Sequence, residues 1–425
     1  MIVKILGDEI KGRLVAPPSK SLTHRALVCS ALVTGKSKIR YPLVSEDTLA
    51  TLRVLSSLGV DTYFNDDYWE VSGGDLKRPK STLFCGESGT TLRFTTALCS
   101  LVDGECGLTG GSSLIKRPIE PLLEGLRQLG VDCGSTNGLP PVTVRGKGRI
   151  MGGDVAIRGD ISSQFVSALL LITPLGDSKT TLRLTTSLES KPYVSLTMDV
   201  QREFGVEVQA SDDMRAFQVE KQNYRPTEIE VEGDWSSSSY LLAAGALNGE
   251  VTVFNLNTDS LQADLKIVDI LDAMGAEIRL REKSITTRKK GLNGIETDLR
   301  DFPDLFPVIA SLCASASGRS VLRGLGRLRY KESDRVKVMI EGLRKMGVKV
   351  RLEGNSLVVE GGKLRGCVID PHNDHRIAMA FALLGLVAED ETTVLDAECV
   401  AKSYPDFWDD LEYIGANVRR ILNEQ

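Results

Sequence analysis

A short motif that recurs six times constrains this chain more than any other feature. Each copy has an apolar residue, a glycine and then a small or β-branched residue, in Leu58-Gly59-Val60, Leu129-Gly130-Val131, Phe204-Gly205-Val206, Met274-Gly275-Ala276, Met346-Gly347-Val348 and Ile414-Gly415-Ala416. The leading residues of successive copies are 71, 75, 70, 72 and 68 positions apart. Each glycine fits the position after a helix, where a left-handed residue ends the helix and directs the chain into a strand. The sequence therefore predicts six copies of one structural unit.

A second helix, rich in small and apolar residues, opens each copy. These helices are expected to begin near Ser21, Thr90, Ser163, Ser237, Asp304 and His375. Each copy then holds two helices and about four strands, which is a βαβ-type unit of the α/β class. Six such units can pack as two domains of three. The turn at Tyr224-Arg225-Pro226-Thr227, followed by Gly233, places the boundary near residues 225–233.

Composition narrows the classes of function. A chain of 425 residues predicts two or more domains, and its net charge of −5 argues against a nucleic-acid-binding protein. Residues 1–14 lack the apolar core of a signal peptide, and no apolar run is long enough to span a membrane. Eight scattered cysteines and only three histidines predict a reducing cytoplasm and no protein-bound metal centre.

Polar and charged residues gather where the opening helices begin. Helix N-termini present free N–H groups and partial positive charge, so they favour anions. Each Ser, Thr or Asp at these places also fits a simple N-cap. Capping does not need cations, yet Lys20, Arg25, Arg93 and Arg376 lie in the first turns. Cations repeated at the end of the helix that disfavours them predict a shared anionic ligand.

The densest run of charge is Arg-Tyr-Lys-Glu-Ser-Asp-Arg at residues 329–335, just before a helix with apolar residues at helical spacing. One interpretation is a solvated helix face. The other is an anion site in which Arg335 and Lys331 bind a carboxylate or phosphate, with Glu332 able to exchange a proton. The basic turn at Arg117 and the loop at Lys402 leave the same two interpretations open. No one of these segments favours a functional site by itself. A functional site is favoured because they all occur at matching places in the repeated units.

Eight segments taken together carry a family resemblance. They are Pro18-Ser19-Lys20-Ser21-Leu22-Thr23-His24-Arg25-Ala26-Leu27, Gly89-Thr90-Thr91-Leu92-Arg93, Arg117-Pro118-Ile119, Ser162-Ser163-Gln164-Phe165, Ser190-Lys191-Pro192-Tyr193, Lys331-Glu332-Ser333-Asp334-Arg335, Asn373-Asp374-His375-Arg376 and Ala401-Lys402. From about Leu14 to Trp408 the chain resembles the EPSP synthases, a family of enolpyruvyl transferases. The resemblance implies a two-domain, inside-out α/β barrel-like fold of six βαβαββ units, three per domain. It places the first domain at 15–230, the second at 1–14 plus 231–425, and the active site in the interdomain cleft.

The resemblance also implies an activity. The enolpyruvyl group of phosphoenolpyruvate would pass to the 5-hydroxyl of shikimate 3-phosphate through a tetrahedral ketal, with release of phosphate, in aromatic amino acid biosynthesis. It implies no metal and no organic cofactor. The expected partners are these two small molecules, with no nucleic acid and no membrane, and the protein is expected to be a cytoplasmic monomer.

The family's site residues carry over onto matching positions of this chain. Phosphoenolpyruvate would be held by Lys20, Gly89, Arg117, Gln164, Arg335, Arg376 and Lys402. Shikimate 3-phosphate would be held by Lys20, Ser21, Arg25, Ser162, Ser163, Gln164, Ser190, Asp304 and Lys331. The catalytic residues would be Asp304, Glu332 and Lys20. Among them, Asp304 would take the 5-hydroxyl proton and Glu332 would protonate the methylene carbon.

Three positions depart from the family pattern. Glu87 and Arg327 stand where Asn is frequent, and Ser88 replaces a common Ala. These changes leave the chemistry in place but leave ligand details and glyphosate sensitivity open.

The sequence leaves two alternatives. The UDP-N-acetylglucosamine enolpyruvyl transferases share the fold but usually have Asn where Ser21 stands, and a reactive Cys that has no counterpart before Arg117. A non-catalytic repeat scaffold would not need cations and carboxylates placed differently in each unit.

Overall fold

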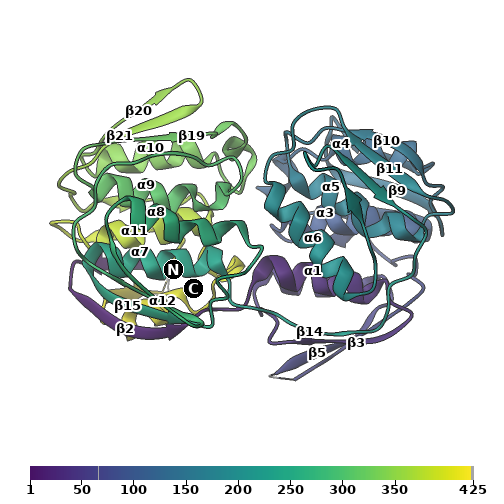
Figure 1. The fold of residues 1–425 in the computed structure, drawn as a ribbon, viewed down its shortest axis with the longest axis horizontal. Helices are drawn as coiled ribbons and strands as arrows, with labels where there is room; N and C mark the ends of the chain where they lie inside the picture. Colours follow the sequence, from purple (N-terminus) through teal and green to yellow (C-terminus); the bar gives the residue numbers. More distant parts are fainter. Residues whose placement is uncertain (66, 423–425) are drawn as a thin grey trace. The chain divides into compact units, whose positions relative to one another are not determined.

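The computed structural model describes residues 1–65 and 67–422, and these form two compact units (Figure 1). The N-terminal unit comprises Pro18–Val231, and the C-terminal unit comprises Met1–Pro17 together with Glu232–Gln425. The sequence-based boundaries stand at 14/15 and 230/231. No helix in the described part of the chain is long and apolar enough to cross a membrane.

The N-terminal unit contains three repeats. The first holds α1 (Lys20–Ala31), β3 (Gly35–Arg40), α2 (Glu46–Ser57), β4 (Asp61–Phe64) and β5 (Tyr68–Gly73). The second holds β6 (Leu83–Phe84), α3 (Gly89–Leu98), β7 (Asp103–Thr109), α4 (Glu120–Gln128), β8 (Asp132–Thr136) and β9 (Leu139–Lys147). The third holds β10 (Gly153–Ile157), α5 (Ser163–Ile172), β11 (Thr180–Leu184), α6 (Lys191–Glu203), β12 (Gln209–Ala210) and β13 (Ala216–Val219), and β14 (Glu228–Glu230) ends the unit.

The C-terminal unit repeats this order. Its first repeat holds β2 (Ile10–Val15), α7 (Trp235–Asn248), β15 (Gly249–Phe254), α8 (Ile267–Ala273), β16 (Glu277–Arg281) and β17 (Ser284–Arg288). The second holds β18 (Glu296–Asp298), α9 (Phe306–Ser315), β19 (Arg319–Arg323), α10 (Arg335–Lys345), β20 (Lys349–Glu353) and β21 (Ser356–Glu360). The third holds β22 (Val368–Ile369), α11 (His375–Gly385), β23 (Thr392–Val394), α12 (Phe407–Tyr413), β24 (Asn417–Ile421) and, from the start of the chain, β1 (Ile2–Leu6).

The described residues form six four-stranded sheets with one common pairing pattern. In the order β6-β7-β9-β8, the first pair is parallel and the other two pairs are antiparallel. Distant segments complete three of the sheets: β14 pairs with β3, β2 pairs with β15, and β1 lies between β23 and β24. The predicted α/β class and the six repeated units, three per domain, are thereby confirmed.

The six repeated glycines behave as the sequence predicts. Each follows the last turn of a helix, and φ is 88° at Gly59, 81° at Gly130, 77° at Gly205, 88° at Gly275, 88° at Gly347 and 97° at Gly415. A side chain beyond Cα would be strained at these angles. The glycine repeats in the sequence because each helix-to-strand turn needs a residue with positive φ.

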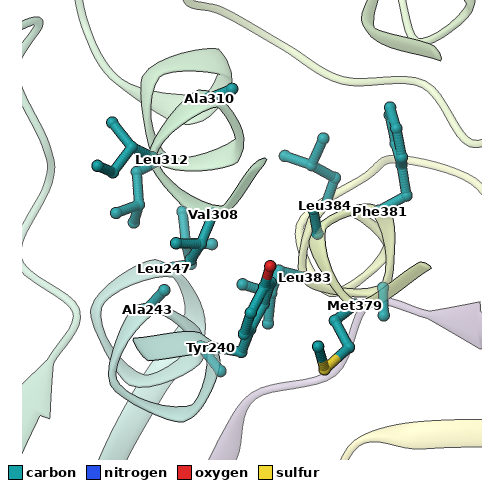
Figure 2. Close-up of a cluster of buried hydrophobic side chains, with 14 of the residues drawn as sticks. Tyr240, Ala243, Leu247, Val308, Ala310, Leu312, Met379, Phe381, Leu383 and Leu384 are labelled. Carbon is teal, nitrogen blue, oxygen red and sulfur yellow. The ribbon is translucent and has the colours of Figure 1, made fainter. Parts of the chain in front are cut away.

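Each unit has its own hydrophobic core, built around the helices that open its repeats. In the C-terminal unit, α7, α9 and α11 face one another, with Tyr240, Val308 and Leu383 among the side chains between them (Figure 2). These helices are buried on nearly all sides, which explains why they are apolar around most of their circumference. Polar groups at their N-termini are consequently held at fixed positions.

Glycine is also required where a strand crosses the end of an opening helix. A Cβ built on Gly73 would lie 2.2 Å from the carbonyl oxygen of Ser30, and one on Gly146 would lie 2.2 Å from that of Val102. In the C-terminal unit, a Cβ on Gly361 would lie 2.0 Å from the carbonyl oxygen of Ala316. The same close approach of strand and helix end thus recurs in three repeats.

Substituting one of these glycines tests the packing directly. We expect Gly146→Ala to lower the free energy of unfolding by about 1–3 kcal/mol, because its methyl group meets backbone that cannot rotate away. The matched control is Gly134→Ala on the neighbouring strand β8, where a Cβ meets nothing within 4 Å. Ala in that strand is expected to be neutral or to stabilise by about 0.5 kcal/mol. Chemical denaturation of both variants measures the difference, and equal stabilities would contradict the packing argument.

Candidate active site

A buried guanidinium organises the N-terminal ends of three segments in the C-terminal unit. Arg335, the first residue of α10, has a side chain that is only 1% exposed. Its Nε lies 2.9 Å from Asp374 Oδ2, and its two terminal nitrogens lie 2.8 Å from Asp304 Oδ1 and 2.6 Å from Glu332 Oε2. Three carboxylates around one guanidinium satisfy a charge that burial would otherwise penalise heavily. The solvated-face interpretation of this stretch is therefore wrong for Arg335.

Asp304 is the carboxylate that three cations of this unit share. Besides Arg335, Lys331 Nζ lies 3.2 Å from its Oδ1 and an Arg376 terminal nitrogen lies 3.4 Å from its Oδ2. Burial alone would raise the pKa of Asp304, but the charges of Arg376, Lys331 and Arg335 outweigh it and hold that pKa well below its usual range. Burial lowers the pKa of Lys331, an effect that the charge of Asp304 opposes. Asp304 is accordingly ionised at neutral pH.

The simple capping interpretation fails for both proposed proton-transfer residues. The N-cap of α10 is Asp334, whose side chain accepts from the Lys337 N–H. Helix α9 begins without any side-chain cap, after the short 3-10 turn Pro303–Leu305 that carries Asp304. Asp304 and Glu332 therefore lie beside helix N-termini without serving as their caps.

Asp374 and Lys402 complete this side of the site. Asp374 caps α11 by accepting from the Arg376 N–H at 3.0 Å, and it also accepts from Ser333 at 3.0 Å. Lys402 is only 3% exposed and donates to the Asn373 carbonyl oxygen at 2.5 Å. The interpretation of Lys402 as an exposed loop residue is thus wrong, and its ammonium group is fixed next to the start of α11.

One further buried carboxyl group of this unit was not found from the sequence. Asp264 is 1% exposed and accepts a hydrogen bond from Ser236 near the start of α7. Burial, reinforced by the negative charge of Asp304, raises the pKa of Asp264 to about 7. The environment therefore shifts the pKa values of Asp304 and Asp264 in opposite directions, a pattern typical of acid–base sites.

The N-terminal unit gathers a second set of cations at the starts of its own helices. Lys20 begins α1 and pairs with Asp47 in the first turn of α2, with Nζ and Oδ2 2.9 Å apart. Arg25 is buried and donates to Thr197 Oγ1 at 2.8 Å and to the carbonyl oxygens of Ser21 and Tyr193. These bonds use three of the five N–H groups that a guanidinium carries. Burial lowers the pKa of Arg25 to about 10, which leaves it a cation at neutral pH.

Helices α3 and α5 meet at their N-terminal turns through a side-chain bridge. Arg93 donates to Gln164 Oε1 at 2.6 Å, and Gln164 Nε2 donates to Thr90 Oγ1 at 2.9 Å. Ser162 caps α5 by accepting from the Gln164 N–H, with Ser163 next to it. Ser190 precedes α6 with φ of 55°. Its hydroxyl group makes no capping hydrogen bond, so the N-cap interpretation does not account for a serine at this position.

Arg117 lies against the glycine-rich loop that opens α3. Its side chain is 4% exposed, so the solvated-turn interpretation is wrong. A Cβ built on Gly89 would lie 3.1 Å from an Arg117 terminal nitrogen, so the guanidinium packs tightly against this glycine. Glu87, one of the three departures from the family pattern, turns toward Ser113 and Leu114. Another, Arg327, is buried and donates to the Arg300 carbonyl oxygen.

Each unit thus brings its share of the predicted residues together. Direct contacts join Asp304, Lys331, Glu332, Arg335 and Arg376 in the C-terminal unit. Sequence reasoning missed the partners Asp47 and Asp374, because a first-turn or capping Asp carries no signal of its long-range contact. Among residues 1–65 and 67–422, no group of three or more His, Cys, Asp and Glu is placed to hold a metal ion.

Solved structures identify the fold class. The chain resembles an enolpyruvyl transferase, NikO from Streptomyces tendae, with a TM-score of 0.80, 19% identity and 98% of each chain covered. It also resembles the EPSP synthase of Acinetobacter baumannii, with a TM-score of 0.82, 27% identity, and 99% of this chain and 100% of the other covered. The architecture is therefore that of the enolpyruvyl transferases.

Sequence relatives identify the family. The EPSP synthase (3-phosphoshikimate 1-carboxyvinyltransferase) family model matches residues 6–411. A 3-phosphoshikimate 1-carboxyvinyltransferase of Dehalococcoides mccartyi is 42% identical, with 96% of each chain covered. One from Methanothermobacter thermautotrophicus is 43% identical, covering 96% of this chain and 97% of the other. The chain belongs to the EPSP synthase family, which confirms the resemblance drawn from its motifs.

Removing the central guanidinium tests the electrostatic account of the C-terminal unit. We expect Arg335→Leu to lower the free energy of unfolding by about 3–5 kcal/mol, because Asp374 stays fully buried and loses its charge partner. Denaturant titration of the purified variant measures this loss.

The control removes an exposed ion pair of the same type in the same unit. Arg323 lies 2.8 Å from Glu296, with the two side chains 52% and 56% exposed, so Arg323→Leu should cost about 0–1 kcal/mol. Similar losses in the two variants would contradict the role assigned to Arg335.

Proposed function

We propose that this protein transfers the enolpyruvyl group of phosphoenolpyruvate to the 5-hydroxyl of shikimate 3-phosphate and releases phosphate. Membership of the EPSP synthase family supports the reaction. The observation that carries the proposal for these residues is the ion cluster of Asp304, Glu332 and Arg335, with Lys331 and Arg376 beside it. It combines anion-binding groups with two carboxylates that are not helix caps.

Both substrates are polyanions, so binding them together requires many cations. Phosphoenolpyruvate is assigned to Lys20, Arg117, Arg335, Arg376 and Lys402, with the Gly89 backbone and Gln164. Shikimate 3-phosphate is assigned to Lys20, Ser21, Arg25, Ser162, Ser163, Gln164, Ser190, Asp304 and Lys331. Arginine forks suit carboxylate and phosphate groups, while each lysine contributes a compact charge. These assignments draw residues from both units of the chain.

Substrate binding also prepares the base. In the ligand-free protein, Asp304 is held by the cations assigned to the substrates, so its pKa is depressed and it is a weak base. Substrate anions compete with Asp304 for Arg335, Arg376 and Lys331. As these cations turn to the substrates, the pKa of Asp304 rises and the carboxylate becomes able to accept a proton.

The chemistry is an addition followed by an elimination. In the addition, Asp304 takes the proton of the 5-hydroxyl while the hydroxyl oxygen bonds to C2 of phosphoenolpyruvate, and Glu332 in its protonated form gives a proton to the methylene carbon. The result is a tetrahedral ketal that still carries phosphate. In the elimination, the new methyl group returns a proton to Glu332, the carbon–carbon double bond re-forms, and phosphate leaves with the proton held by Asp304. Lys20, which pairs with Asp47, is assigned to stabilise the charge of the leaving phosphate.

All assigned residues lie on one chain, and the eight cysteines are free thiols. We therefore also propose a cytoplasmic monomer.

Acceptor specificity provides the first test of the function. Phosphate release from phosphoenolpyruvate is followed with shikimate 3-phosphate and with UDP-N-acetylglucosamine, each offered separately. We expect release only with shikimate 3-phosphate. Phosphate release with the nucleotide sugar alone would show that the protein is a UDP-N-acetylglucosamine enolpyruvyl transferase instead. Release with neither acceptor would overturn the proposed activity.

The two carboxylates provide the second test. We expect Asp304→Asn and Glu332→Gln each to reduce single-turnover ketal formation by about 10²–10⁴-fold, the usual worth of positioned acid–base catalysis. Asp334→Ala is the control, because it removes the real cap of α10 and should cost about 1 kcal/mol of stability with little loss of rate. Ketal formation near the wild-type rate in both folded variants would remove these roles.

A further inference from the structure

Two loops of the second repeat are joined along their backbones. The Cys85 N–H donates to the Thr109 carbonyl oxygen at 2.8 Å, and the Gly111 N–H donates to the Gly86 carbonyl oxygen at 2.8 Å. One loop leads into α3 through Gly89, and the other leads to Arg117. The position of Arg117 is thus coupled to the glycine-rich loop.

The Glu87 carboxylate holds the second loop at the point where its 3-10 turn, Leu114–Lys116, begins. Its Oε2 accepts from Ser113 Oγ at 2.6 Å and from the Leu114 N–H at 2.9 Å, and its Oε1 accepts from the Ser113 N–H at 3.4 Å. The turn has no side-chain cap of its own. A Cβ on Gly111 would lie 2.1 Å from Glu87 Oε1, so a side chain at this position would displace the carboxylate.

The same serine joins Glu87 to Arg117. Ser113 donates its hydroxyl hydrogen to Glu87, which leaves the oxygen to accept from an Arg117 terminal nitrogen at 3.3 Å. A hydroxyl group has one hydrogen and two lone pairs, so this direction is fixed by the presence of an acceptor at Glu87. Arg117 is the residue directly after the turn, so the turn sets the position of its backbone. Ser113, just before the turn, contacts its guanidinium.

We infer that Glu87 is a positioning residue that orients Arg117, through Ser113, for the carboxylate or phosphate of phosphoenolpyruvate. Glu87 itself does not bind the ligand, because its oxygens are directed to Ser113 and Leu114. This inference rests on the proposed function for the identity of the ligand at Arg117. The position of Arg117 beside Gly89 does not depend on the proposed function, because it follows from the hydrogen bonds and close contacts described above.

The variants follow from the hydrogen-bond inventory. Glu87→Ala removes all three acceptor contacts, and we expect the KM for phosphoenolpyruvate to rise about tenfold or more. Glu87→Gln can place its amide oxygen at the Oε2 position and keep the two short bonds, so the KM should stay within about threefold. In both variants the KM for shikimate 3-phosphate should stay within about twofold.

The control is another hydrogen-bonded glutamate of the same repeat. Glu105 on β7 accepts from Arg145 at 2.8 Å, and both side chains are about half exposed. We expect Glu105→Ala to leave both KM values unchanged. An unchanged KM for phosphoenolpyruvate in Glu87→Ala, or equal changes in all kinetic constants of both Glu87 variants, would overturn the positioning role.

Hydrogen exchange separates this inference from the proposed function. The Ser113 and Leu114 amides should exchange at least tenfold faster in Glu87→Ala than in the wild type, with distant segments unchanged, and Leu114 should stay protected in Glu87→Gln. Unchanged exchange at Leu114 in Glu87→Ala would overturn the inference even if the enzyme is active. A wild-type chain that releases no phosphate would overturn the function, and the exchange result would still decide whether Glu87 holds the Arg117 turn.

Discussion

The buried pairing of Arg335 with three carboxylates is the interaction on which the C-terminal unit depends. A guanidinium cannot lose its charge inside a protein, so burial obliges the chain to supply partners. Asp304 comes from before α9, Glu332 from before α10 and Asp374 from the cap of α11. One side chain therefore fixes the N-terminal ends of helices from two repeats against each other. The apolar cores hold the helices in place, and this cluster determines how their charged ends are arranged.

Internal ion pairs also explain how a ligand-free protein can concentrate so much positive charge. In the C-terminal unit Asp304 and its neighbours pair with the cations, and in the N-terminal unit Asp47 pairs with Lys20. Arg93 is held instead by a hydrogen bond to the neutral amide of Gln164. Substrate anions would then exchange partners with groups that are already positioned, which costs less than ordering flexible side chains at the moment of binding. The same exchange would convert Asp304 from a weak base into a useful one. Binding and catalysis are thus two consequences of one arrangement of charges.

Sequence reasoning succeeded where the requirement is local. Gly59 and its five counterparts need a left-handed backbone at the same step of each repeat, so their spacing alone predicted six repeated units. Site residues such as Arg335 could be predicted only because several charged segments occur at matching places in the repeats and also match the family motifs. The partners were not predictable, because Asp47 and Asp374 look like ordinary residues of a helix start. Glu87 was visible as a departure from the family, but its contact with Ser113 lies 26 residues away and needs the folded loops.

The central claim is that substrate anions take cations away from Asp304, and its pKa measures this directly. Carbon-13 NMR of Asp-labelled protein, with the Asp304 signal assigned from Asp304→Asn, would follow the carboxyl titration with and without substrates. The account predicts a pKa well below the usual value of about 3.9 in the ligand-free protein and a higher pKa when phosphoenolpyruvate and shikimate 3-phosphate are bound. A pKa that is ordinary in the free protein, or one that does not change on binding, would contradict it.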